Sequence, residues 1–370
     1  MKLAVISGPF SSIGGIERLI LEINRRLHAK ISITVIIPYA KRSSEVDAWI
    51  KRYEGSGKIK FYRYVKRGML PGGLGHIIRI LRDSDIVYFT TLSPVQNFSI
   101  YALAMLMMRR RIIYAMHTKY FSEDVRRGES SARMFASRMR YAFMLKTAIN
   151  VHLDNKDDLR KYEKKMKRVY YIPPVLRIGR REMKKEGGTF KVLFVGRLDA
   201  FNKGLDILCD VIREVSKKAG RIEFDVVGEG KDRDILAKLG SGSLKLLGNL
   251  SDSALDKEYA EADLFVFPSR FENFGIALLE AQMRGIPAVA FDITGPRDIM
   301  SNKAQGRLAK PFDAKEFASY VLEYYRLWKK DRNAYHLMRA EISEEAMRRF
   351  DPEKSAALFL SMLREVAGSR

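Results

Sequence analysis

Residues 263–280 read DLFVFPSRFENFGIALLE. The run Leu264–Phe267 is apolar throughout and ends at Pro268, a pattern typical of a buried strand. The segment after Gly275 continues as an amphipathic helix to about Arg284. The stretch therefore predicts a strand, a loop and a helix, which is the repeating unit of an α/β fold.

Two glutamates flank the start of this helix. Glu272 lies on the loop before it, and Glu280 lies on its second turn. Between them Phe274, Gly275 and Ile276 present backbone N–H groups at the positive end of a helix dipole, which favours an anion. Phe274 and Glu280 are about 9 Å apart along a helix. This spacing fits a sugar nucleotide, with a sugar at one carboxylate and a ribose at the other; the simpler alternative is that both glutamates are solvated.

The composition is that of a globular protein with a charged surface. Its 370 residues, 46% hydrophobic and 30% charged, are enough for two domains. The single cysteine, Cys209, excludes an intrachain disulfide and favours the reducing cytoplasm. The longest apolar run, residues 98–108, is too short for a membrane span, which needs about 20 residues. Residues 1–6 predict a first strand rather than a signal peptide.

The net charge of +23 lies entirely in the first half of the chain. Residues 1–185 contain 38 Lys and Arg against 15 Asp and Glu, whereas residues 186–370 contain 29 of each kind. A charge confined to one half indicates a polyanionic partner for that half.

Short β-rich runs alternate with helical patterns along the chain. In the first half, strands are expected at 3–7, 33–37, 59–64, 85–90, 112–117 and 148–153, and helices at 17–28 and 133–146. In the second half, strands are expected at 190–195, 222–227, 264–267 and 288–291, and helices at 204–219, 231–239, 312–330 and 352–366. This alternation predicts two Rossmann-like, doubly wound α/β domains that face each other across a cleft.

The paired prolines Pro173 and Pro174, followed by a charged tract, read as a linker between the domains. We expect an amino-terminal acceptor-binding domain at 1–174, a linker at 175–188, and a donor domain at 189–350. The last segment, 351–370, is expected as a helix that returns to the first domain. Ligands of such folds bind at the carboxyl ends of the strands.

A glycine pair, Gly14 and Gly15, opens a helix shortly after the first strand. Its lack of side chains lets the backbone approach a diphosphate or a sugar, although ordinary turn chemistry explains it equally well. The pattern is not G-x-G-x-x-G, which counts against a dinucleotide dehydrogenase.

Three further side chains follow strand ends. Arg197 and Lys203 lie between the strand at 190–195 and the next helix, where two cations can neutralise a departing diphosphate. Ordinary solvated cations are the alternative. His117 follows the strand at 112–116 and is a candidate because of that place, although most single histidines are structural. No histidine pair has metal-ligand spacing, so we expect no protein-bound metal.

Taken together, these motifs resemble the retaining glycosyltransferases of family 4, the group 1 transferases of GT-B fold. The motifs match in order and spacing over nearly the whole chain, and those in the carboxyl-terminal half are the more specific. The matching pieces are Gly14–Arg18, His117, Gly196–Arg197, Lys203–Gly204, Val227–Gly230, Glu272, Glu280, Gly285–Pro287 and Gly295–Pro296.

The resemblance implies a role for each site residue. Arg197 and Lys203 would hold the donor diphosphate, Glu280 the ribose and Glu272 the donor sugar. The backbone of residues 274–276 would meet sugar and phosphate. It also implies retention at the anomeric carbon and no cofactor, with a UDP- or GDP-hexose as substrate.

The amino-terminal residues have implied roles as well. His117 would approach the transferred sugar, and Gly15 would face the diphosphate. The chain departs from the family at residues 295–298, Gly-Pro-Arg-Asp, where a Gly-Gly pair followed by Glu is frequent. It also offers no evident carboxylate nucleophile, and we do not assign that role to Glu272.

The leading hypothesis is therefore a transferase that moves a hexose to a glycan or lipid-linked acceptor held by the basic half. Candidate acceptor contacts are residues 66–72 and the basic, aromatic and Met-rich run at 126–146. That run has the composition of a helix that docks on anionic lipid, which predicts peripheral membrane association; a core helix with a solvated basic face is the alternative.

Two other classes remain as alternatives. A GT-B-fold epimerase or phosphorylase would use a similar sugar site. A nucleic-acid binder would suit the net charge but would leave Glu272 and Glu280 without a role, so we expect no nucleic-acid partner.

Overall fold

The computed structural model divides the chain into two compact units, Met1–Arg177 with Pro352–Arg370, and Ile178–Asp351. The structure describes residues 1–7, 15–38, 50–51, 59–64, 71–90, 98–116, 131–176, 188–240, 242–300 and 305–368.

The first unit is built on a seven-stranded parallel sheet with the strand order β3-β2-β1-β4-β5-β6-β7. The order reverses at β1, which is the mark of a doubly wound sheet. The strands are β1 Lys2–Ile6, β2 Ser32–Pro38, β3 Ile59–Tyr64, β4 Ile86–Thr90, β5 Ile112–Met116, β6 Asn150–Leu153 and β7 Arg168–Tyr171.

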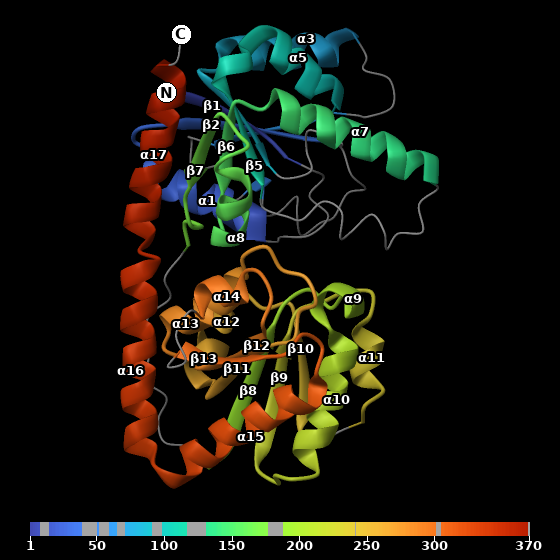
Figure 1. Cartoon of the computed structure of the whole chain (residues 1–370), viewed down its shortest axis with the longest axis vertical. Coiled ribbons are helices and arrows are strands. Elements are labelled where there is room, and N and C mark those ends of the chain that lie inside the picture. The colour runs from blue at the N-terminus through green and yellow to red at the C-terminus, as the bar shows by residue number, and fades with distance from the viewer. Residues whose placement is uncertain are drawn as a thin grey trace. The chain divides into compact units, whose positions relative to one another are not determined.

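Helices cover both faces of this sheet (Figure 1). They enclose two apolar cores, one for each face. The last helix, α17, packs into one of these cores through Phe359 and Leu363, next to residues of α1 and β1. The helices are α1 Gly15–Leu27, α3 Pro71–Asp83, α5 Phe98–Met108, η1 Arg109–Arg111, α7 Ser131–Thr147, α8 Lys156–Tyr162 and α17 Pro352–Gly368.

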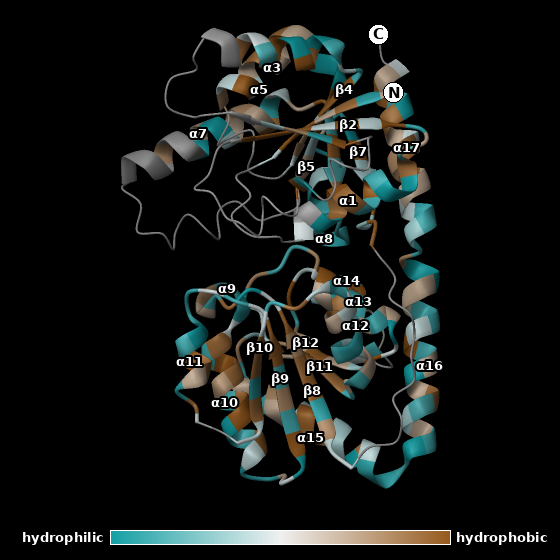
Figure 2. Ribbon diagram, turned by 180° about the vertical axis from the view of Figure 1, so that it is seen from behind, coloured by the Kyte–Doolittle hydropathy of each residue, from teal (hydrophilic) through white to brown (hydrophobic). Residues whose placement is uncertain are grey.

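The second unit repeats the plan with a six-stranded parallel sheet of order β10-β9-β8-β11-β12-β13. The order reverses at β8, so β8 and β11 lie side by side at the switch point. Its strands are apolar in Figure 2 because both faces are covered. They are β8 Phe190–Val195, β9 Ile222–Val227, β10 Leu244–Gly248, β11 Leu264–Phe267, β12 Ala288–Phe291 and β13 Gly306–Ala309.

The helices of the second unit lie on both sides of its sheet, with α10 and α11 on one side and α12, α13 and α14 on the other (Figures 1 and 2). An apolar core joins β8 and β9 to α10 and α15. The helices are α9 Ala200–Lys203, α10 Leu205–Ser216, α11 Arg233–Ala237, α12 Asp252–Glu261, α13 Ile276–Met283, α14 Pro296–Ile299, α15 Ala314–Lys330 and α16 Arg332–Arg349.

The α/β fold class expected from the sequence is confirmed, with a parallel sheet in each unit. The elements that the sequence did not predict include strands β7, β10 and β13 and helix α16. Within the described ranges, the helices include none that is both long and apolar enough to cross a membrane.

Candidate functional site

The candidate site of the second unit lies at its switch point, where the loops after β8 and β11 leave the carboxyl edge of the sheet. The first loop leads into the one-turn helix α9, and the second leads into α13. In doubly wound sheets this is the place where ligands bind. Residues 263–280 contain β11, the second of these loops and the start of α13.

The loop after β8 is held rigid at both ends of α9. The carboxylate of Asp199 accepts hydrogen bonds from the backbone N–H of Asn202 at 3.0 Å and from its side chain at 2.9 Å. Burial acts to raise the pKa of Asp199, but these bonds and the nearby Arg197 outweigh it, so the pKa lies below its usual value. At the other end, Gly204 takes a left-handed φ of 63°. The short helix that carries Lys203 is therefore fixed in place.

The two loops are joined by Arg270. Its backbone N–H donates to the carbonyl of Asn202 at 2.9 Å, and its guanidinium donates to the carbonyl of Ala200 at 3.0 Å. The same guanidinium binds both oxygens of Asp206, at 2.7 and 2.5 Å. This two-bond contact lowers the pKa of Asp206 and raises that of Arg270. Such a forked arrangement fixes direction as well as distance.

Lys203 and Glu272 meet across the two loops. The Lys203 ammonium donates to Oε2 of Glu272 at 2.5 Å and lies 5.2 Å from the ring centroid of Phe267. The two charged side chains are 19% and 18% exposed, so a ligand can reach both. The structure thus brings together a cation and a carboxylate that are 69 residues apart in the sequence.

Arg197 belongs to the same loop as Lys203 but stands out further into solvent. Its side chain is 58% exposed, and its guanidinium lies 3.9 Å from the carboxylate of Asp199. It is available to an incoming anion.

The start of α13 follows the prediction. Gly275 precedes the helix with a φ of 101°, a conformation that suits glycine, and Ile276 is the first helical residue. The first N–H groups of a helix have no partner inside it, so this end can accept an anion. Phe274 is buried against Phe350, with ring centroids 5.7 Å apart. Its carbonyl lies so close to Gly295 that a β-carbon there would approach it to 2.5 Å.

Glu280 is more buried than Glu272. It is 8% exposed, and its Oε2 accepts a hydrogen bond of 2.9 Å from the hydroxyl of Tyr259, on α12. Arg284 lies over the ring of Tyr259 at 4.5 Å and donates to Asp256 at 2.6 Å. These contacts fix the direction of the Glu280 carboxylate.

Gly14 and His117 lie outside the described residues and stay predictions, whereas Gly15 is the first residue of α1. In the part of the chain that is described, no three His, Cys, Asp or Glu side chains are grouped so as to hold a metal ion.

The sequence did not predict the hydrogen bond of Tyr259 to Glu280 or the two hydrogen bonds of Arg270 to Asp206. Tyr259 precedes Glu280 by 21 residues, and Arg270 follows Asp206 by 64, so no local pattern links the partners. It also missed the stacking of Phe201 on Phe271.

The sequence of the second unit matches a known family. The model of the family "Glycosyl transferases group 1" matches residues 189–326. The chain is 31% identical over 170 residues to 2-deoxystreptamine N-acetyl-D-glucosaminyltransferase of Niallia circulans, a match of 45% of this chain and 42% of that protein. It is 30% identical over 141 residues to phosphatidyl-myo-inositol mannosyltransferase of Mycolicibacterium smegmatis, a match of 37% and 36%. The chain thus spans less than half the length of these curated relatives.

Solved structures match over the whole chain. Anabaena Alr3699/HepE, in complex with UDP and glucose, superposes with a TM-score of 0.77 at 16% identity over 98% of this chain and 99% of that one. Sucrose-phosphate synthase of Thermosynechococcus elongatus gives 0.72 at 15% identity over 99% and 98%. At such identities the likeness shows the fold. Residues 189–326 are thus similar in sequence to the group 1 glycosyl transferases, and the chain has the GT-B fold.

Proposed function

We propose that the chain is a retaining glycosyltransferase that moves a hexose from a UDP- or GDP-sugar to a glycan or lipid-linked acceptor. The observation that carries the proposal is the Lys203–Glu272 pair at the sheet's switch point, beside the amino terminus of α13. The matched family and the two curated relatives, which are sugar transferases by name, support the reaction class.

The proposed chemistry needs positive charge at the leaving group. The bond from the anomeric carbon to the diphosphate oxygen breaks, a bond to the acceptor oxygen forms, and the acceptor proton ends on the departing phosphate. Negative charge therefore grows on the diphosphate, and the Lys203 ammonium and the end of α13 can stabilise it. Exposed Arg197 offers a further cation. In this proposal these groups stabilise the leaving diphosphate, and the reaction uses no cofactor.

Glu272 serves in this proposal as a sugar-binding group. Its carboxylate already accepts a charged hydrogen bond from Lys203, which suits an acceptor of hydroxyl protons better than an attacking nucleophile. Retention at the anomeric carbon rests on the family resemblance. Proton NMR of the product's anomeric coupling tests it, and an inverted product would contradict it.

The test of the reaction is release of nucleoside diphosphate from UDP- and GDP-hexoses, with and without acceptor. A total lipid extract and a panel of methyl glycosides serve as acceptors. We expect release that depends on an acceptor. A changed sugar still attached to its nucleotide would instead indicate an epimerase, and a sugar phosphate made with free phosphate would indicate a phosphorylase.

The proposal also places the enzyme at the cytoplasmic face of an anionic membrane, as a peripheral protein. The support comes from α7, whose seventeen residues include no acidic side chain. The helix packs on its sheet through buried Tyr141 and Met144. A second apolar stripe, at a spacing of four residues, is exposed: Phe135 66%, Met139 57% and Phe143 47%.

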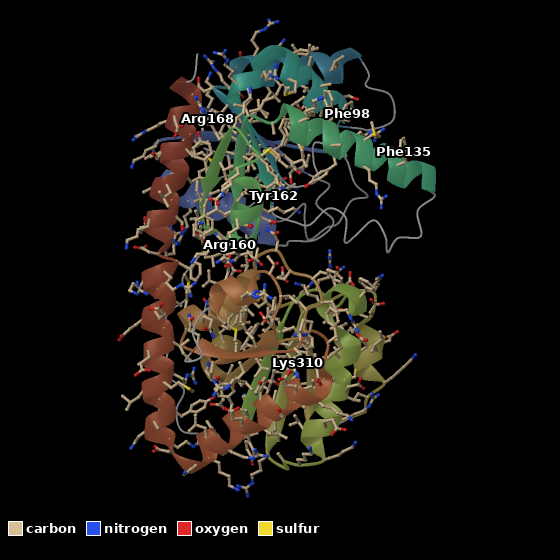
Figure 3. All side chains as sticks on the ribbon, viewed as in Figure 1. Phe98, Phe135, Arg160, Tyr162, Arg168 and Lys310 are labelled. Atoms are coloured by element: carbon tan, nitrogen blue, oxygen red, sulfur yellow. The ribbon has the colours of Figure 1, made fainter. Side chains whose placement is uncertain are left out.

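This stripe distinguishes α7 from a core helix whose outer face is merely basic. Exposed Arg138 and Arg140 lie next to it in the sequence, and the guanidinium of Arg140 lies 5.8 Å from the ring centroid of Phe98. Figure 3 shows Phe135 on the part of α7 that extends beyond the sheet. Apolar side chains among arginines are what an interfacial helix presents to anionic lipid.

Sedimentation with vesicles tests this placement. We expect the protein to pellet at 0.1 M salt with equal phosphatidylglycerol and phosphatidylcholine, and to stay in solution with phosphatidylcholine alone. Each lysine or arginine near an anionic surface contributes about 1 kcal/mol. Arg138→Ser with Arg140→Ser should therefore weaken binding at least about tenfold, whereas Arg160→Ser, at an exposed side chain of α8, should not. Wild-type protein that stays in solution with anionic vesicles would contradict the placement.

A further inference from the structure

One feature of the second unit has no part in the function proposed so far. Phe201, on α9, and Phe271, on the loop after β11, stack with their rings 4° from parallel and their centroids 5.7 Å apart. Phe201 is 46% exposed, and neither ring belongs to the apolar core of the unit. An aromatic pair outside the core, with one ring exposed and the other partly buried, calls for a reason other than packing.

The pair is presented rigidly. Phe201 lies on a single helical turn that is capped by Asp199 at its start and by Gly204 at its end. Phe271 directly follows Arg270, whose side chain and backbone are bonded to the other loop. Rings held in this way lose little conformational freedom when a ligand binds, as is typical of aromatic binding anchors.

The pair also has a definite place relative to the charged site. Phe201 precedes Lys203 by two residues, and Phe271 is the neighbour of Glu272. Glu280, in contrast, is held by Tyr259 of α12. Helices α12 and α13 lie on the side of the sheet opposite α10, which follows α9 (Figure 1). In a ligand with its ribose at Glu280 and its sugar at Glu272, the rings lie at the sugar end and away from the base.

A hexopyranose matches what these groups offer. One face of such a ring carries C–H groups of weakly positive character, which suit the negative face of an aromatic ring. Its hydroxyls need charged or polar partners at its edge, and Lys203 and Glu272 supply them. A flat apolar surface beside an ion pair therefore favours a sugar over an alkyl chain, which would contact the apolar surface but offer the charged groups no hydrogen bond.

We propose that Phe201 and Phe271 form a stacking subsite for a hexopyranose ring. The ring is either the transferred sugar of the donor or a sugar of the acceptor, and both share the chemistry just described. This inference rests on the proposed transferase function, because that function puts a sugar at Glu272.

Calorimetric titration separates the two sources. UDP, UDP-glucose, GDP and GDP-mannose are titrated into wild-type protein and into Phe201→Ala and Phe271→Ala. If the ring belongs to the donor, the variants lose about fivefold to tenfold in affinity for the nucleotide sugar and nothing for the bare nucleotide. Phe201→Trp, which keeps a flat ring, should restore binding. Leu337→Ala, at an exposed apolar residue of the same unit, should bind as wild type.

The acceptor source has its own readout. Methyl α-D-glucopyranoside and methyl α-D-mannopyranoside are examined by saturation-transfer NMR on protein saturated with the nucleotide it binds. If the ring belongs to the acceptor, the donor affinities stay unchanged and the transfer signal of the glycoside falls in Phe201→Ala. Circular dichroism confirms that the variants are folded.

Two outcomes would overturn the proposed stacking subsite. Equal losses for UDP and UDP-glucose would mean that the rings hold the nucleotide, which overturns the proposal. Unchanged donor affinities with an unchanged or absent glycoside signal would overturn it as well. Absence of nucleotide-sugar binding to the wild-type protein would instead refute the proposed function, so the two failures are distinguishable.

Discussion

Lys203 and Glu272 form a charged pair that is ready before any ligand arrives. At 2.5 Å the ammonium and the carboxylate neutralise each other, and each is about one fifth exposed. A bound diphosphate would compete for the lysine, and a sugar hydroxyl would add a proton donor to the glutamate. When a donor binds, Lys203 can therefore exchange Glu272 for the diphosphate, and Glu272 can accept a hydrogen bond from the sugar.

Removing either member of this pair should abolish transfer without unfolding the chain. Glu272→Gln keeps the size of the side chain and removes its charge, and Lys203→Met removes the cation. We expect turnover to fall at least about 100-fold in each, the loss typical of a group that stabilises developing charge. Near-normal product formation in folded Lys203→Met would refute its role.

A more subtle effect is expected at Tyr259. Tyr259→Phe keeps the ring under Arg284 and removes the hydroxyl that directs Glu280. A hydrogen bond to a charged group contributes about 1.5–3 kcal/mol, so nucleotide affinity should fall by about tenfold. The control is a 2′,3′-dideoxy nucleoside diphosphate, which lacks the ribose hydroxyls. If the variant weakens its binding equally, Glu280 does not act through the ribose.

The sequence predicted those site residues that a short stretch of sequence marks by itself. Gly275, Glu272 and Glu280 follow from one strand–loop–helix stretch, and Lys203 follows from its place after a strand. Tyr259 could not be found, because nothing in α12 marks one tyrosine as the partner of a carboxylate on the next helix. Such contacts arise only when the fold brings distant elements together.

At the level of elements, the two loops of the site pack backbone against backbone. A β-carbon on Gly204, whose φ is 63°, would lie 2.2 Å from the carbonyl oxygen of Pro268. A β-carbon on Gly228 would lie 2.0 Å from that of Gly196. Gly204 lets the two loops approach closely enough for the charged pair to form, and Gly228 lets the chain after β9 pack on the loop after β8.

Gly204→Ala should therefore lower the melting temperature far more than Gly240→Ala. Gly240 has a similar φ of 59°, but open space surrounds its β-position. The conformational strain alone costs about 1–2 kcal/mol and is common to both. The additional loss at Gly204 measures the contact with Pro268. Equal melting temperatures for the two variants would show that the loops can separate freely.

The strand β9 carries a carboxylate that opposes folding at neutral pH. Asp225 is 4% exposed, and its Oδ1 finds no hydrogen-bond partner among the described residues. Burial first, and then the charge of Glu223, raise its pKa, while Lys191 and Lys245 act in the opposite direction. Its folded pKa thus lies above the unfolded value, so the folded state binds this proton more tightly and loses stability as pH rises.

Asp225→Asn should accordingly raise the melting temperature at pH 7. The gain should shrink as pH falls through the folded pKa and disappear below about pH 4, where the carboxyl is protonated in both states. Thermal scans between about pH 3 and pH 8 measure this directly. A gain that is independent of pH would assign the effect to packing instead of charge.

The sequence predicted strongly apolar elements well and weakly patterned ones poorly. The buried strand β11 was found with its bounds, whereas β10 was missed: its residues are only partly buried, so its pattern is less apolar. Helix α16 was missed because its apolar positions form no single stripe. Both elements take their conformation from the neighbours they pack against.

At the level of the whole molecule, charge and chemistry are divided along the chain. The matched family region lies in the balanced half, residues 186–370, and the excess of positive charge lies in residues 1–185. The described part of the basic half adds the exposed apolar stripe of α7. This division agrees with a donor site in one unit and an anionic partner for the other, as proposed.

The most direct test of the central claim is calorimetric titration of UDP- and GDP-hexoses into the full chain. We expect wild-type protein and Leu337→Ala to bind one of these donors with equal affinity, and Lys203→Met to bind it at least about tenfold more weakly, since charged hydrogen bonds contribute about 1.5–3 kcal/mol. Wild-type protein that binds none of them, or Lys203→Met that binds as tightly as wild type, would contradict it.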